Sequence, residues 1–196
     1  MEAVLSRPLT LDEQREEFAR GRFLAMPTAG MLAWAVVGVG GLCLPPSLQV
    51  WLLWLATGSI FGLGLLVARY TGEDLLGKTR PRNEFDRLFM SAVAGAWLVF
   101  AIVVPFVQAD YTSLPLTMGI LAGLMWMPFS WIIRHWIGYF HAVARTLGLV
   151  LAWYLWPDAR FVVLPAIIVA VYAVTLVVLA RRPRSLPVLA PARAQP

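Results

Sequence analysis

The sequence predicts an all-α fold: a polytopic transmembrane helix bundle of six spans, with both termini in the cytoplasm and a short N-terminal cytoplasmic or interfacial helix. Three observations lead to this prediction. Hydrophobic residues make up 60% of the chain and charged residues only 14%, against roughly one quarter charged in soluble domains. The apolar residues fall into six runs, each close to the ~20 residues that cross a bilayer. The basic residues lie between these runs, as the orientation rule for membrane proteins requires.

The N-terminal cytoplasmic segment, residues 1–22, is expected to contain one short helix. Residues 1–8 are predicted to be disordered. Thr10 and Glu13 have the spacing of a capping box, in which the threonine hydroxyl accepts the Glu13 amide and the Glu13 carboxylate reaches back. The helix is expected to end near Gly21. Because this charged segment contains several acids before the first apolar run, it does not have the start of a signal peptide, and we expect the first span to be retained.

The transmembrane domain is predicted to cover residues 23–180. Its six spans are expected at residues 23–44, 48–68, 88–107, 114–133, 137–156 and 161–180. The second run is the most continuous. Pro128 is expected to kink the fourth, because proline removes the hydrogen bond to the carbonyl of Leu124. The tail, residues 181–196, is rich in proline and alanine and is predicted to be a disordered cytoplasmic segment.

The basic residues fix the predicted orientation. Fifteen of the sixteen fall in the N-terminal segment, in residues 69–87, in Arg134 and Arg145, and in the tail. Arg160 is the one basic residue assigned to the other side. Since Lys and Arg are retained on the cytoplasmic side of the inner membrane, both termini are predicted to lie in the cytoplasm. The three outer connections are then short, and the longest loop, 70–86, is cytoplasmic.

Residues 72–79 match the phosphate-loop pattern G-x-x-x-x-G-K-[ST]. That pattern binds phosphates only where a strand precedes it and a helix follows, so that backbone amides converge on the anion. Here a membrane span precedes it, Pro81 follows closely, and Glu73 and Asp74 would place negative charge within the loop. We therefore expect no nucleotide at residues 72–79. The dispersed basic charge likewise predicts no nucleic-acid partner.

Arg145 is the most informative polar residue. It is expected roughly 12 Å inside the fifth span at 1.5 Å per residue, where a charge usually marks a functional interior or a snorkelling side chain. A basic pocket for a phosphate or carboxylate headgroup is one hypothesis; an interfacial helix, or pairing of Arg145 with an acid before the third span, is the other. In both, Arg145 faces protein or water. The candidate ligand-binding residues are Arg134, His135, His141, Arg145, Glu84 and Asp86.

Three tryptophans, Trp34, Trp97 and Trp126, are predicted to lie mid-span, where they either line a cavity or pack against other helices. Gly58-x-x-x-Gly62 and Gly119-x-x-x-Gly123 are expected to serve close packing within the bundle, with homo-oligomerisation as the alternative. Cys43 is expected to be a small buried apolar residue.

No acid falls mid-span, which argues against the carboxylate relay of a coupled transporter. Two histidines without a third ligand predict no metal site, and no cofactor is expected. The leading hypothesis is a non-enzymatic membrane protein that binds a lipid headgroup, a small anion or a protein partner at its cytoplasmic side. The alternatives are a membrane-embedded enzyme, with His141 as general base and Arg145 holding a lipid-like substrate, and an uncoupled transporter or channel subunit. Membrane lipids are the expected partners, with a second copy or another membrane protein as alternatives.

The stretch W-I-I-R-H-W-I-G-Y-F-H-A-V-A-R at residues 131–145, with A-W-Y-L-W-P at 152–157 and R-P-R-N-E-F-D-R-L-F at 80–89, resembles a family of small bacterial multi-pass inner-membrane proteins of unknown function. The resemblance extends over most of the chain beyond the N-terminal helix. It implies that Trp136, Gly138, His141 and Arg145 form the polar stretch of the fifth span and that the protein lies in the inner membrane. It implies no activity.

Overall fold

The computed structural model describes residues 9–75, 83–98 and 100–184, with the side chains at 96, 97 and 100 excepted. The predicted disorder of residues 1–8 and of most of the tail falls outside the described residues. Throughout the described part the regular secondary structure is helical. The helices are α1 (Leu11–Ala19), α2 (Ala25–Cys43), α3 (Pro46–Gly58), α4 (Ile60–Thr71), α5 (Glu84–Leu98), α6 (Phe100–Ala109), α7 (Ser113–Leu124), α8 (Trp126–Ile132), α9 (Ile137–Leu155), η1 (Pro157–Ala159) and α10 (Arg160–Arg181).

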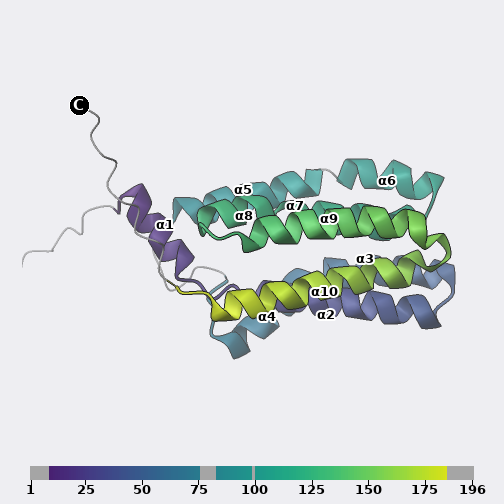
Figure 1. Cartoon of the computed structure of the whole chain (residues 1–196), viewed down its shortest axis with the longest axis horizontal. Helices are drawn as coiled ribbons and strands as arrows, with labels where there is room; N and C mark the ends of the chain where they lie inside the picture. The colour runs from purple at the N-terminus through teal and green to yellow at the C-terminus, as the bar shows by residue number, and fades with distance from the viewer. Residues whose placement is uncertain (1–8, 76–82, 99, 185–196) are drawn as a thin grey trace, which may run out of the picture.

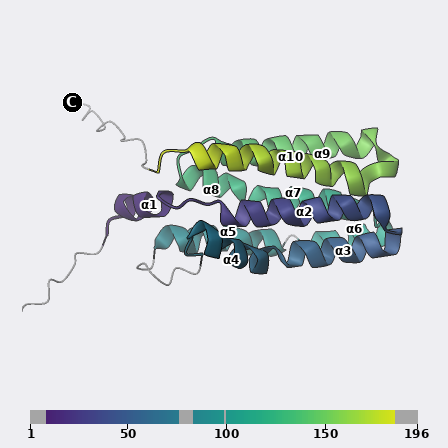
Figure 2. The same ribbon diagram turned by 90° about the horizontal axis from the view of Figure 1, so that it is seen from below.

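The helices form an elongated bundle of two layers (Figures 1 and 2). One layer contains α2, α3, α4 and α10, and the other contains α5 to α9. Helix α10 packs along both α2 and α9, so it connects the layers. Helix α1, the end of α4, the α8–α9 turn and the end of α10 lie together at one end of the bundle, which we call the α1 end. The α2–α3, α6–α7 and α9–α10 connections lie at the opposite end.

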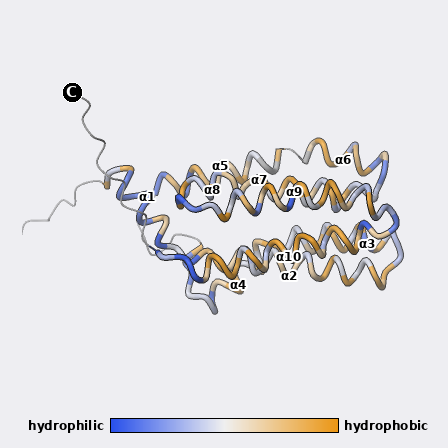
Figure 3. Tube along the Cα trace, in the orientation of Figure 1, coloured by the Kyte–Doolittle hydropathy of each residue, from blue (hydrophilic) through white to orange (hydrophobic). Residues whose placement is uncertain are grey.

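Within the described residues, three helical segments are long and apolar enough to cross a membrane: Ala25–Cys43, Ser113–Ile132 and Pro157–Arg181. The pair α3–α4 is a fourth when its two halves are counted as one broken span. Figure 3 shows hydrophobic residues along the lengths of these helices and hydrophilic residues mainly at the two ends of the bundle. The fold is therefore that of a helical membrane protein. The described residues of all six predicted segments are largely helical, and the crossing of the membrane by α5–α6 and by α9 stays a prediction.

The second predicted span is bent, although it is the most continuous apolar run of the sequence. Helices α3 and α4 meet at Ser59 with an angle of 47°. The Thr57 hydroxyl donates to the Leu53 carbonyl at 2.7 Å, and the Ser59 hydroxyl donates to the Ala56 carbonyl at 2.9 Å. Hydroxyls that bond back to the preceding turn compete with the backbone hydrogen bonds and bend helices. Thr57 and Ser59 therefore interrupt the span, although they lower its mean hydropathy only slightly.

The helix of the fourth predicted span is interrupted close to Pro128, and the kink itself stays a prediction. The fourth span is divided at Met125, between α7 and α8, next to the carbonyl of Leu124 that loses its partner when residue 128 is proline. The two halves still form one segment of 20 residues, Ser113–Ile132.

Glycines set the closest helix contacts. A Cβ at Gly41 in α2 would lie 2.4 Å from the carbonyl oxygen of Phe161 in α10, and one at Gly119 would lie 2.5 Å from Leu149 in α9. These positions admit no larger residue without movement. A Cβ at Gly58 or Gly62 would meet nothing within 4 Å. The expected packing role is therefore confirmed for the Gly119 pair and wrong for the Gly58 pair.

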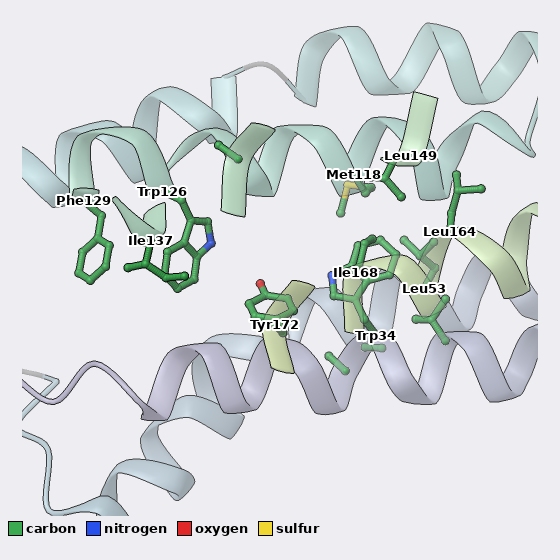
Figure 4. Close-up of a cluster of buried hydrophobic side chains, with 14 of the residues drawn as sticks. Trp34, Leu53, Met118, Trp126, Phe129, Ile137, Leu149, Leu164, Ile168 and Tyr172 are labelled. Atoms are coloured by element: carbon green, nitrogen blue, oxygen red, sulfur yellow. The ribbon is translucent and has the colours of Figure 1, made fainter. Parts of the chain in front are cut away.

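Between the layers lies a continuous core that includes Trp34, Leu53, Leu149, Leu164 and Ile168, all of them fully buried. Figure 4 shows these side chains filling the space between α2, α7, α9 and α10. The expectation for Cys43 is wrong: it is the last residue of α2 and its side chain is exposed.

Candidate functional site

The structure separates the six candidate ligand-binding residues into three places. His141 and Arg145 lie inside the bundle and are completely buried. Arg134 and His135 lie in the turn between α8 and α9, at the α1 end. Glu84 and Asp86 are in the first turn of α5. The predicted pocket is therefore not one site: its four basic residues lie in two separate places, and Glu84 bonds Arg87 at 3.0 Å rather than Arg145.

The interior site, which we call the Arg145 cluster, brings together polar and aromatic side chains from four helices. Its members are Trp34 (α2), Trp126 (α8), His141 and Arg145 (α9), and Tyr172 and Thr175 (α10). The prediction that Arg145 faces protein rather than lipid is confirmed, since its side chain is 0% exposed.

A chain of hydrogen bonds fixes the protonation of His141. The Thr175 hydroxyl donates to the Val171 carbonyl at 2.8 Å, so it accepts from His141 Nδ1–H at 2.9 Å. In a neutral imidazole the other nitrogen is then an acceptor. It takes a hydrogen from Arg145 Nη1 at 3.4 Å. Both ring nitrogens of His141 are thus engaged, and the imidazole is the neutral Nδ1–H form.

Aromatic rings surround the Arg145 guanidinium. Its carbon lies 5.5 Å from the ring centroid of Trp34 and 5.4 Å from that of Tyr172, within the range of cation–π attraction. The Trp126 ring stacks on His141 at 4.2 Å. Two of the three predicted cavity-lining tryptophans therefore enclose this cluster. The side chain of the third, Trp97, lies outside the described residues.

Two glycines make room for the cluster. A Cβ at Gly30 would lie 2.6 Å from the Tyr172 hydroxyl oxygen, and a Cβ at Gly123 would lie 3.3 Å from Arg145 Cδ. Gly30 is one turn before Trp34 on the same face of α2, and the rings of Trp34 and Tyr172 both lie against the Arg145 guanidinium. Figure 4 shows the indole nitrogen on the side that faces Tyr172.

The second site begins with the tight turn between α8 and α9. The Ser130 hydroxyl donates to the His135 carbonyl and accepts the Tyr139 amide. The His135 amide bonds the Ser130 carbonyl at 3.1 Å, and Arg134 has a φ of 49°. A helix often ends with one left-handed residue of this kind, usually glycine. Arginine there costs of order 1 kcal/mol, so the turn holds a cation at the expense of stability.

An open groove of about 530 Å³ lies over this turn. Its flank is aromatic, with Trp131 52%, Trp136 55% and Tyr139 42% exposed. Its basic residues are Arg134 and Arg15 of α1, together with His135. Cationic and aromatic side chains therefore share one surface where two helices end.

Arg15 also joins α1 to α8. Its Nε donates to the Ile132 carbonyl at 2.9 Å, its Nη2 donates to the Trp131 carbonyl, and its guanidinium carbon lies 4.2 Å from the Trp131 ring centroid. The arginine thus satisfies carbonyls that the end of α8 leaves without partners. Burial, followed by the nearby Arg134, lowers the pKa of Arg15. Burial and Arg182 lower the pKa of His135 from 6.5.

The acids near this end have structural roles. Asp12 lies 3.6 Å from Arg134 Nη2 and is largely exposed. Glu73, from the phosphate-loop match, accepts the backbone amides of Leu24 and Ala25 at 3.0 Å and so caps the start of α2. Gly72, with a φ of 72°, ends α4. The first residues of the match therefore terminate one helix and cap another; the rest of it, 76–79, lies outside the described residues.

Sequence reasoning did not find Arg15, Tyr172 or Thr175. The signal for the last two was present, because they are polar residues three apart on one face of the otherwise apolar α10. Arg15 carried no such signal, since it is one of several charged residues on a short helix.

The fold and the two sites define a helical membrane protein with a buried cationic centre and a basic, aromatic groove at one end. The chain belongs to the DUF7010 family, a family of unknown function, whose model matches residues 11–182. This confirms the resemblance seen in the sequence. No curated protein and no solved structure matches the chain.

Proposed function

We propose that the protein is a bacterial inner-membrane protein with six spans and cytoplasmic termini, and that the groove at the α8–α9 turn binds the headgroup of an anionic phospholipid. The observation that carries the proposal is the joint lining of this groove by Arg15, Arg134 and exposed aromatic rings. Tryptophan and tyrosine favour the level of the headgroups, and arginine recognises phosphate through a planar set of donors.

The distribution of charge supports the orientation. Apart from Arg160 and the buried Arg145, the described basic residues gather at the α1 end, where Arg22, Arg69 and Arg181 accompany the groove. Arg160 is at the opposite end, 3.4 Å from Asp110, which offsets its charge. This asymmetry is typical of a protein whose basic end stays in the cytoplasm.

The groove fits a headgroup better than the interior fits a catalytic centre. An enzyme with His141 as general base needs a free ring nitrogen near substrate. Both nitrogens of His141 are engaged, and its side chain is 0% exposed. The groove, in contrast, is open and lies at the ends of α8 and α9.

Lipid binding tests the proposal. The purified protein in nanodiscs of phosphatidylcholine, with and without phosphatidylglycerol, is analysed by native mass spectrometry for retained lipid. We expect preferential retention of phosphatidylglycerol, weakened about fivefold in Arg134→Gln, since one arginine near a membrane surface contributes about 1 kcal/mol. The matched control is Arg87→Gln, which removes an exposed cation outside the groove. Equal retention by the wild-type protein and Arg134→Gln would refute the groove as the site.

A further inference from the structure

The Arg145 cluster contains polar atoms that the protein itself does not satisfy, and all of them are donors. Within the described residues, Arg145 Nε, Arg145 Nη2 and Trp34 Nε1 are buried and have no hydrogen-bond partner. The side-chain acceptors of the cluster, His141 Nε2, Thr175 Oγ1 and Tyr172 Oη, each already accept a hydrogen bond. What the cluster needs is therefore an acceptor.

The required acceptor is negatively charged. Arginine remains a cation in proteins, and a buried ion without a partner is strongly unfavourable. Among the described residues no carboxylate contacts Arg145, and its only side-chain hydrogen bonds, at 3.4 Å, go to the neutral groups of Tyr172 and His141. Cation–π contacts with Trp34 and Tyr172 compensate only part of the charge.

We propose that the Arg145 cluster is an internal binding site for a small inorganic anion, held by the free Arg145 donors and the Trp34 indole N–H. This site is separate from the headgroup groove and does not depend on the proposed function. The surroundings favour a small occupant. Tyr172 lies against Gly30 and Arg145 against Gly123, which leaves no room for a bulky group beside these atoms.

The Arg145 cluster would hold the anion inside the bundle, about two helical turns from the α8–α9 turn. Arg145 is eight residues into α9, a rise of roughly 12 Å at 1.5 Å per residue. The Thr175 hydroxyl holds the proton of His141 on Nδ1, which leaves His141 Nε2 to accept from Arg145 Nη1 and keep it in place. His141 and Thr175 are thus positioning residues, and Arg145 and Trp34 are the anion ligands.

Bromide is a suitable probe because it quenches tryptophan fluorescence on contact, and Trp34 and Trp126 both lie in the cluster. The purified full-length protein in detergent is titrated with sodium bromide against sodium gluconate at constant ionic strength. We expect a saturable quenching component above the linear surface quenching. The melting temperature should rise with bromide over the same range, because a ligand that binds only the native state stabilises it.

The decisive variant is Trp34→Phe, which keeps an aromatic ring at this position and removes the indole N–H together with the five-membered ring that carries it. Loss of one hydrogen bond to a charged acceptor should raise the bromide concentration that gives half of the stabilisation by roughly tenfold. The matched control is Trp51→Phe, at an exposed position on α3, which should behave as wild type. Arg145→Leu should abolish the effect; where it does not fold, Trp34→Phe decides.

The proposal is overturned by the absence of a saturable component in the wild-type protein. It is equally overturned when the bromide-dependent rise in melting temperature is the same in Trp34→Phe as in the wild type. Phospholipid that co-purifies with the wild type and is lost in Trp34→Phe, without any bromide effect, would assign the cluster to a lipid headgroup instead.

Discussion

Replacement of Gly138 by alanine should destabilise the protein, although alanine is the better helix former. Gly138 is the second residue of α9. An alanine Cβ there would lie 2.2 Å from the carbonyl oxygen of Trp126 and 2.7 Å from Ser130 Cβ. Real contacts of this kind are longer by an ångström or more, and the first obstacle is backbone rather than a side chain that can rotate. Helices α8 and α9 must therefore separate.

The magnitude follows from two opposing terms. Forcing an extra methyl group into a packed contact typically costs 1–3 kcal/mol. The gain in helix propensity from glycine to alanine is about 0.5–1 kcal/mol. Since the clash is with backbone, we take the upper part of the first range and expect a net loss of about 1–2 kcal/mol in the free energy of unfolding. The separation would also displace the turn that carries Arg134, so lipid retention should fall as well.

The free energy of unfolding can be measured by titration of the detergent-solubilised protein with sodium dodecyl sulfate, followed by circular dichroism. Gly62→Ala is the matched control, because its Cβ would meet nothing within 4 Å and only the propensity gain applies. We expect Gly62→Ala to be at least as stable as the wild type. Should Gly138→Ala prove equally stable, the close approach of α8 to α9 would be wrong, and with it the geometry of the groove.

Three further predictions concern the ends of the bundle. Glu73→Gln should lower the free energy of unfolding by about 1 kcal/mol, because a carboxylate at the start of a helix is attracted to the positive end of the helix dipole and to the free backbone amides. The same detergent titration measures this loss. Since the folded pKa of His135 is below 6.5, its contribution to stability is present above that pH and lost as the pH falls below it; His135→Gln should reduce the loss of stability between pH 7.5 and 5.5. Cys43 is exposed at the end of the bundle opposite α1, so it should react with a membrane-impermeant maleimide on intact cells. Asp12→Cys in a Cys43→Ser background should react only after lysis. The reverse pattern would mean that the topology is inverted.

The helical segments were predictable because each depends on neighbours in the chain. The capping box at Thr10 and Glu13 appears as expected, and the start of α9 at Ile137 coincides with the predicted start of the fifth span. The break at Met125 follows from the missing amide of Pro128. The bend at Ser59 was missed, since hydropathy does not register hydroxyls that bond back to the helix.

The candidate site was predictable only in part. Arg145 stood out because a cation in an apolar helix is costly wherever the helix packs. Its neighbours did not, since Tyr172 and Trp34 meet it from α10 and α2, distant in sequence. The sequence predicted Arg134 beside Arg145, but the turn at residues 133–136 separates the two arginines, so that Arg134 lies in the groove and Arg145 in the interior.

The sequence by itself determined that this is a helical membrane protein, where its main apolar helical segments lie, and that one arginine within an apolar segment requires an explanation. These follow from composition and from periodicity along a single chain. Only the tertiary structure decided which residues surround that arginine, that its free groups are all donors, and that the basic groove is separate from it. The reason is that the rotation of each helix about its axis, and the choice of its neighbours, depend on contacts between residues far apart in the chain.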